Sequence, residues 1–281
     1  MDNDRAEKTA CAKLHTTQQA FIAVRQRTLK LCEPLLVEDF GVQPMADASP
    51  PKWHLAHTSW FFETFCLAGY QKSYSAFHPA YSELYNSYYN VVGNPFPRAL
   101  RGSLSRPTLD EVFAYRRHVD AAVVELVNAM LGASSPAALV KVTELSQLGI
   151  EHEQQHQELL VTDLKYNFGH NPLYPAYTSR TCATNGSSGA IRFDEANPGL
   201  VQIGADEKGF SFDNERPRHE VFLQPFRVAN RLVTNAEFLE FVEDEGYQRP
   251  ELWLAEAWQQ LQAGTLAPQP LYWRRTQDQW S

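Results

Sequence analysis

Two histidines one helical turn apart are the residues of this sequence best suited to bind a metal ion. His152 and His156 lie in the segment EHEQQHQE, residues 151–158. At a spacing of four residues, two imidazoles lie on the same face of a helix and can bind one cation. Polar side chains without partners are costly in a bundle core, and a metal removes that cost by taking the nitrogen lone pairs. The alternative is a pair of solvated histidines on an exposed face.

A second segment offers a third ligand. His54 and His57 lie three residues apart in the aromatic stretch WHLAHTSWFF, residues 53–62. Both lie on roughly the same side of a helix, so periodicity does not choose between them. Helix bundles build metal sites from side chains on facing helices, and we expect one of the two histidines to complete the site. The competing interpretation is a histidine that simply packs in the core.

The neighbours of the histidine pair have separate expected roles. Gln155 lies about 60° from His152 and about 100° from His156 around the helix, so its amide can hydrogen-bond to a molecule bound at the metal. Glu158 is rotated about 200° from His156, so it is not expected to bind the same metal. It is expected to hold the metal ligands in place or to contact a neighbouring helix. His152 and Glu153 also fit the zinc-protease pattern HExxH, with the glutamate as general base. The following residues lack the further ligands of the common zinc proteases, which disfavours that interpretation.

The spacing of apolar residues, with breaks at proline and glycine, predicts four long helices in the first 177 residues. Thr16 or Thr17 is the expected N-cap of the first helix, Ser49 of the second and Thr108 of the third. Four helices of this length, joined in sequence, indicate a four-helix bundle. Their expected ranges are about 16–32, 52–67, 108–131 and 137–168.

The residues from 178 onward have a different character, with short strands and turns. A polar loop at residues 184–189 precedes them, and Thr234 is the expected N-cap of a short helix. The sequence therefore predicts an α+β protein with two domains, residues 1–177 and 178–281. The expected strands are 200–203, 220–223 and 226–228, and the expected helix is 235–242.

Composition and charge exclude several classes of protein. The 281 residues include 33 acidic and 25 basic side chains, a net charge of −8, which argues against binding nucleic acid by neutralising phosphates. No apolar run approaches the ~20 residues that span a bilayer, and no secretory signal is visible. The four cysteines are widely spaced, unlike a zinc ribbon or a disulfide framework. We expect a cytoplasmic protein that binds neither nucleic acid nor membranes.

Taken together, these segments resemble the EgtB family of ergothioneine biosynthesis. In the first half, the resemblance rests on SPPKWHLAHTSWFFE at residues 49–63 and on HxxxHxE at residues 152–158. In the second half, it rests on GAD at 204–206, FDNERPRH at 212–219 and VTNxxF at 233–238. EgtB proteins are non-haem iron sulfoxide synthases. The resemblance implies a DinB-like four-helix bundle followed by the first part of a domain similar to formylglycine-generating enzymes.

The resemblance also implies a metal site. By position, His57, His152 and His156 match the three histidine ligands of the family, and His54 is then a neighbour of the site. The implied metal is iron(II). Three neutral imidazoles bind one face of an octahedral ion and leave other positions open, as in related iron oxygenases.

The implied reaction uses O2 to join hercynine (Nα-trimethylhistidine) to cysteine or γ-glutamylcysteine, with formation of a C–S bond and a sulfoxide. Family members bind the carboxylate of the thiol substrate with arginines, and the matching loop of this chain holds Arg98 and Arg101. The planar guanidinium group suits that task because it can bind a carboxylate through two hydrogen bonds. Arg106 lies in the same loop and has no assigned role.

In the family, the C-terminal domain continues past the point where this chain stops. Its catalytic tyrosine has no counterpart here, so no catalytic residue is assigned. We therefore expect a truncated chain that binds iron(II) but makes little sulfoxide. The alternatives are a related selenoneine or ovothiol sulfoxide synthase, and a DinB-like metal-binding protein or thiol transferase without oxygen chemistry.

Overall fold

The computed structural model describes residues 2–87, 93–131, 135–179, 189–276 and 279–280. The chain divides into two compact units, Met1–Arg180 and Thr181–Ser281. The first unit is helical, whereas the second contains short strands and short helices. This mixture confirms the predicted α+β class. None of the described helices is both long enough and apolar enough to cross a membrane.

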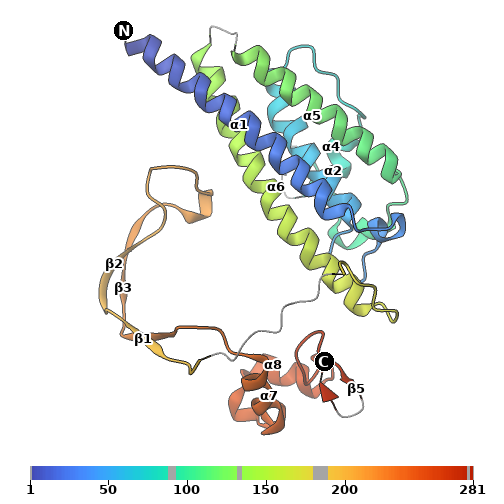
Figure 1. Cartoon of the computed structure of the whole chain (residues 1–281), viewed down its shortest axis with the longest axis vertical. Helices are drawn as coiled ribbons and strands as arrows, with labels where there is room; N and C mark the ends of the chain where they lie inside the picture. The colour runs from blue at the N-terminus through green and yellow to red at the C-terminus, as the bar shows by residue number, and fades with distance from the viewer. Residues whose placement is uncertain (1, 88–92, 132–134, 180–188, 277–278, 281) are drawn as a thin grey trace. The chain divides into compact units, whose positions relative to one another are not determined.

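Four long helices build the first unit and lie side by side in Figure 1. Helix α1 packs against α5 and α6, and α2 also packs against α5 and α6. The predicted four-helix bundle is therefore confirmed. The long helices are α1 (Asp2–Cys32), α2 (Pro51–Phe62), α5 (Leu109–Leu131) and α6 (Pro136–His170).

Short helical segments complete the first unit. A π-helical turn, η2, continues α2 to Leu67, where the sequence predicts the end of this helix. The segment η3 carries the two arginines predicted to bind substrate. The short segments are η1 (Val37–Gly41), η2 (Glu63–Leu67), α3 (Ala68–Tyr70), α4 (Tyr81–Leu84) and η3 (Arg98–Ser103).

The start of α1 differs from the prediction. The helix begins at Asp2, so Thr16 and Thr17 lie in its interior. The hydroxyl of Thr16 donates to the carbonyl of Ala12, and that of Thr17 donates to the carbonyl of Lys13. Threonine hydroxyls inside a helix bond back to the preceding turn in this way. The predicted cap was therefore wrong.

Ser49 does not cap α2. The N-cap residue is Pro50, and no side chain accepts a hydrogen bond there. The hydroxyl of Ser49 instead accepts a 2.9 Å hydrogen bond from the guanidinium of Arg101. Its backbone N–H donates to the carboxylate of Asp163 at 2.8 Å. The prediction was wrong because tertiary partners occupy both polar groups of Ser49.

The two other predicted threonine caps are confirmed. Thr108 Oγ1 accepts a hydrogen bond from the backbone N–H of Glu111 at 3.3 Å. Thr234 Oγ1 accepts one from the backbone N–H of Glu237 at 3.2 Å. In each case the glutamate carboxylate also bonds back to the threonine N–H, so each helix begins with a capping box.

A buried ionic network links three helices of the bundle. The carboxylate of Glu153, on α6, is fully buried and pairs with Arg25 of α1 at 2.9 Å and with Arg116 of α5. Thr28 Oγ1 donates to the same carboxylate at 2.6 Å. Arg25 also pairs with Asp120 at 2.6 Å. Removing one partner would leave a buried charge uncompensated, so this network holds α1, α5 and α6 in register.

The second unit contains two-stranded antiparallel ladders. Strand β2 pairs with β3 so that Val201 lies opposite Val221, and β1 pairs with β4. The predicted strands and helix are confirmed with small shifts at their ends, and most of the predicted loop at 184–189 lies outside the described residues. The sequence did not predict β1, because its residues Asp194 and Glu195 are poor strand formers. The elements are β1 (Phe193–Ala196), β2 (Gly199–Ile203), η4 (Asp213–Glu215), β3 (His219–Leu223), β4 (Phe226–Ala229), α7 (Asn235–Glu243), η5 (Gly246–Gln248), η6 (Pro250–Leu252), α8 (Ala255–Gln262), β5 (Arg275–Thr276) and β6 (Gln279–Trp280).

Candidate metal centre

The close packing of α2 against α6 positions the histidines. Gly149 lies on α6 one turn before His152, against Phe61 and Phe62 of α2. A Cβ atom at Gly149 would lie 2.5 Å from Cε1 of Phe62, which is closer than packed atoms approach. The missing side chain therefore lets the two helices approach each other beside the histidine-bearing turns.

His57, His152 and His156 converge at this crossing. One ring nitrogen from each lies within 4.8 Å of the corresponding nitrogens of the other two. The Nε2 atoms of His57 and His152 are 3.3 Å apart. Two nitrogens bound to one ion at about 2.1 Å lie about 3 Å apart when they occupy neighbouring positions. The structure thus brings together the three residues predicted to bind the metal.

The hydrogen bonds of His57 fix its tautomer. Its Nδ1 lies 2.6 Å from the carbonyl oxygen of Tyr85, which can only accept, so Nδ1 carries the proton. In the neutral ring, Nε2 then holds a lone pair that faces His152. The buried Nδ1 atom of His152 has no hydrogen-bond partner within the described residues. A cation bound by the facing nitrogens would remove the cost of placing their lone pairs together, so these residues fit a metal ion.

The histidines are neutral near pH 7. Burial lowers the pKa of His152 to about 4, against the opposing effect of the Glu153 carboxylate. Burial and the neighbouring histidines place the pKa of His57 and the pKa of His156 well below the ordinary range. Metals bind the neutral imidazole, so protons do not compete for these ligands at neutral pH.

His54 lies beside the three histidines and makes two contacts of its own. Its Nδ1 is 2.9 Å from Nδ1 of His156, and its Nε2 is 3.0 Å from Oδ2 of Asp163. Burial lowers the pKa of His54, although Asp163 opposes the shift. The structure therefore distinguishes His54 from His57, which periodicity alone did not.

A cavity of about 290 Å³ opens onto the three histidines. The predicted substrate-binding residues Arg98, Arg101 and Gln155 all line it. Arg106 is not among the lining residues, and its guanidinium donates to the carbonyl of Ser105. The loop arginines and the glutamine of α6 thus share one space with the candidate ligands.

Arg101 is held in place on the wall of this cavity. Its guanidinium carbon lies 3.3 Å from the ring centroid of Trp53, a cation–π contact. It also donates to the hydroxyl of Ser49 at 2.9 Å and to that of Ser87 at 3.0 Å. Trp53 was not among the predicted site residues, although the i, i+4 spacing of Trp53 and His57 predicts that the two rings share a helix face.

Asp163 is a second residue that sequence analysis missed. It follows His156 by seven residues, which brings it back to within about 20° of the same helix direction. That spacing is the signal that could have identified it. Tyr85 contributes through a backbone carbonyl, for which the sequence holds no residue-type signal.

The zinc-protease interpretation of HExxH is contradicted. Glu153 has no exposed surface and does not line the cavity. Burial alone would raise the pKa of its carboxyl, but Arg116 and Arg25 outweigh that effect and lower the pKa to about 2. A fully buried carboxylate engaged with two arginines is not available to accept a proton from a water molecule bound at the histidines.

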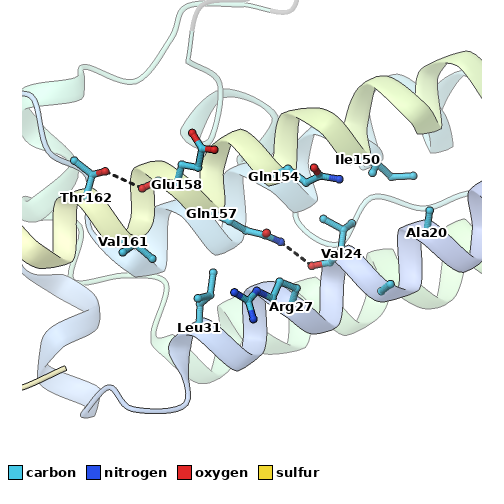
Figure 2. Close-up of a pocket in the computed structure, with 11 residues that line it drawn as sticks. Ala20, Val24, Arg27, Leu31, Ile150, Gln154, Gln157, Glu158, Val161 and Thr162 are labelled. Atoms are coloured by element: carbon cyan, nitrogen blue, oxygen red, sulfur yellow. Dashed lines mark hydrogen bonds between the residues drawn. The ribbon is translucent and has the colours of Figure 1, made fainter. Parts of the chain in front are cut away.

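A larger cavity, of about 770 Å³, lies between α1 and α6 (Figure 2). Figure 2 shows the side chain of Gln157 reaching across it to the carbonyl of Val24, to which its amide donates at 3.0 Å. Glu158 is among the residues that line this cavity, and Figure 2 shows its carboxylate pointing away from α1. Most of the lining is aliphatic and none of the three histidines contributes to it, so the smaller cavity is the one suited to metal chemistry.

Two domain families match the chain. The DinB superfamily matches residues 20–160, which include all three histidines. The sulfatase-modifying factor enzyme 1-like domain matches residues 195–280. This domain order is the one that the resemblance to EgtB implies.

Three mycobacterial relatives, each named hercynine oxygenase, are similar to the chain. The protein of Mycolicibacterium thermoresistibile is 27% identical over 267 residues, covering 93% of this chain and 56% of the relative. That of Mycobacterium tuberculosis is 30% identical over 230 residues, covering 80% of this chain and 50% of the relative. That of Mycolicibacterium smegmatis is 36% identical over 123 residues, covering 43% of this chain and 28% of the relative.

The chain thus spans about half the length of the first and third of these relatives. The order of the two domains and the similarity to hercynine oxygenases confirm the resemblance to EgtB proteins. Because the DinB match covers half of the 281 residues, the chain belongs to the DinB superfamily, in the EgtB-like form that adds a sulfatase-modifying-factor-like domain.

Proposed function

We propose that this chain carries the metal centre of an iron(II)- and O2-dependent sulfoxide synthase of ergothioneine biosynthesis, which joins hercynine to cysteine or γ-glutamylcysteine. The observation that supports this proposal most is the convergence of three neutral histidines on the wall of an arginine-lined cavity. The names of the relatives support the choice of hercynine as one substrate.

The donor set favours a catalytic ion over a structural one. His57, His152 and His156 supply three nitrogens, whereas a structural zinc site has four protein ligands. Three neutral ligands leave coordination positions open and leave the charge of a divalent ion uncompensated, which suits an anionic substrate. Bound there, iron(II) supplies the activation of dioxygen and the affinity for a thiolate.

The two bundle cysteines whose side chains the structure describes do not offer a competing mechanism. Cys32 and Cys66 are free and buried. Burial raises the pKa of both thiols to about 12, so neither is a nucleophile at neutral pH. Free thiols are also the state expected in the cytoplasm, where we place the protein.

The proposed reaction balances without a further reductant. The S–H bond of the thiol and a C–H bond of the hercynine ring break, and a C–S bond forms. One oxygen atom enters the sulfoxide, and the other leaves as water with the two protons. O2 accepts four electrons, two from formation of the C–S bond and two from oxidation of the sulfur.

The arginines of the cavity provide the charge that a thiol substrate needs. We assign the substrate carboxylate to Arg98 and Arg101, because a guanidinium binds a carboxylate through two parallel hydrogen bonds. Arg101 is already fixed by Ser49, Ser87 and Trp53, so little side-chain entropy is lost when a ligand binds. Gln155 offers an amide donor and acceptor to whatever binds beside the histidines.

The test uses the full chain, loaded with iron(II) under anaerobic conditions. We expect one iron per chain, and its loss in each of the variants His57→Ala, His152→Ala and His156→Ala. The loaded protein is then mixed with hercynine, cysteine or γ-glutamylcysteine, and air. O2 uptake is followed with an electrode. We expect slow turnover, with little sulfoxide formed, and mass spectrometry should show that the C–S-bonded sulfoxide equals in amount the O2 consumed.

His118→Ala is the matched control, because His118 lies in the same bundle but outside the cavity and should leave iron binding unchanged. Thiol transfer without O2 uptake would replace the proposal with a thiol transferase. Iron binding with neither O2 uptake nor product would contradict the oxidative chemistry for this chain.

A further inference from the structure

A buried line of three side chains runs from the bundle interior to the metal centre. The carboxylate of Asp163 contacts Nε2 of His54 at 3.0 Å, and Nδ1 of His54 contacts Nδ1 of His156 at 2.9 Å. His54 is 2% exposed and Asp163 is 6% exposed. Since water hardly reaches these contacts, the protein itself must supply the donor and the acceptor of each hydrogen bond.

The direction of the hydrogen bonds follows from the carboxylate. Asp163 Oδ2 accepts the backbone N–H of Ser49 at 2.8 Å and, as a carboxylate oxygen, accepts from His54 as well. Nε2 of His54 therefore carries the proton, and Nδ1 of the neutral ring is an acceptor. His156 must then donate from its own Nδ1, which leaves the lone pair of His156 on Nε2.

We infer that His54 and Asp163 are positioning residues, which hold His156 in the tautomer and ring orientation that present Nε2 to the metal. The inference rests on the proposed metal site, because it concerns how one of its ligands is held. Ligand histidines generally donate their second ring N–H to a carboxylate, a carbonyl or water. Here a second histidine relays that hydrogen bond to a carboxylate.

The relay also joins the metal centre to the arginine that faces the cavity. Ser49 donates its backbone N–H to Asp163, and its hydroxyl accepts from Arg101. One residue at the start of α2 therefore contacts both the carboxylate behind His156 and the cation on the cavity wall. Ser49 therefore supports both Asp163, which lies behind the candidate metal ligand His156, and Arg101, which we assign to the substrate carboxylate.

The first test reads the tautomers directly in the metal-free protein. Nitrogen-15 NMR of the imidazole rings at pH 7.5 distinguishes a protonated ring nitrogen from one with a lone pair. We expect His156 with its proton on Nδ1 and His54 with its proton on Nε2. A proton on Nε2 of His156 in the unaltered protein would overturn the inference. This measurement needs no variant and no bound metal.

The second test removes the relay and keeps its volume. His54→Phe retains a ring but no nitrogen, so we expect His156 to lose its fixed tautomer and the affinity for cobalt(II) to fall about 10- to 100-fold. Asp163→Asn keeps an oxygen that can accept from Ser49 and His54 while removing the charge. In that variant we expect His156 to keep its tautomer and the affinity to fall less.

Controls separate positioning from folding. His118→Phe makes the same replacement on α5, where the ring contacts the carbonyl of Ser75, and it should leave cobalt(II) affinity unchanged. Thermal unfolding of each metal-free variant shows whether it is folded. Unchanged cobalt(II) affinity in a folded His54→Phe variant would refute the relay. Failure of the unaltered chain to bind cobalt(II) or iron(II) would instead refute the metal site, while the NMR result would still decide the relay.

Discussion

Trp53 lies face to face with His57, with ring centroids 4.4 Å apart and ring planes 13° from parallel. His57 also stacks on Trp60, at 5.3 Å and 14°. The guanidinium of Arg101 covers the Trp53 ring. A candidate ligand and a candidate substrate-binding cation therefore share one indole ring, and a change at Trp53 should affect both.

Replacement of Trp53 by leucine should destabilise the protein by about 2–4 kcal/mol, since it removes buried area, an aromatic pair and a cation–π contact. The indole N–H of Trp53 makes no hydrogen bond within the described residues, so Trp53→Phe should cost clearly less. Urea unfolding of both metal-free variants measures the difference. Equal losses of stability in the two variants would show that the stack contributes little.

Glu153→Leu should cost about 3–5 kcal/mol, because it leaves Arg25 and Arg116 buried without a counter-charge. Glu151→Leu provides the control on the same helix, where the carboxylate accepts a hydrogen bond from the Gln147 amide at 2.6 Å and has no ion pair within the described residues. It should cost less than about 1 kcal/mol. Chemical unfolding of the metal-free protein measures both. A Glu153→Leu variant with unchanged stability but altered catalysis would revive the general-base interpretation.

The metal-free protein should lose stability as the pH falls from about 6.5 toward 4. Unfolded histidines have a pKa of about 6.5, whereas the pKa of His152 in the folded chain is lowered to about 4 by burial. Between these values the unfolded state binds protons that the folded state does not, so each such histidine costs about 1.4 kcal/mol per pH unit.

Urea midpoints measured between pH 7.5 and 5 test this dependence. His152→Gln has one titrating group fewer and should show a shallower slope. Above pH 4.5 the Glu153 carboxyl adds little, because its pKa is about 2 and it is ionised in the folded state. A midpoint that rises on acidification would contradict the assignment of neutral buried histidines.

Gly149→Ala should destabilise the bundle even though alanine is the better helix former. Its Cβ would lie 2.5 Å from Phe62 Cε1 and 3.0 Å from Phe61 Cε1, both in buried rings. We expect overpacking to cost about 1–3 kcal/mol, more than the helix propensity gained. In Gly69→Ala the new methyl group meets no atom within 4 Å, so stability should stay the same or rise. Thermal unfolding compares the two.

The sequence predicts the bundle well because apolar residues recur along each long helix, and because proline marks the first turn of α2 and of α6. It also predicts that His152 and His156 share a face, since four residues make about one turn. Their role as metal ligands stays a prediction. The tautomer of His57 could not be predicted, because it depends on a backbone carbonyl, at Tyr85, from a connecting segment.

The choice between His54 and His57 shows a second limit of sequence reasoning. Both lie on the side of α2 that faces α6, and their different partners become apparent only when the crossing of the two helices is known. Ser49 was mistaken for a cap for a similar reason, since local pattern favours a cap but Asp163 and Arg101 occupy its polar groups. Tertiary partners decide such cases.

Helix α6 carries His152, Glu153, His156 and Asp163, and each of these residues contacts a partner outside α6. Adding or deleting one residue between positions 152 and 163 would turn part of this set by about 100° around the helix axis. Apolar side chains can repack after such a rotation, because their contacts are not directional. The hydrogen bonds and ion pairs of these four residues would be lost, because each needs one particular partner. Natural variation in the length of this helix should therefore fall outside residues 152–163 in every homologue that retains the three histidines.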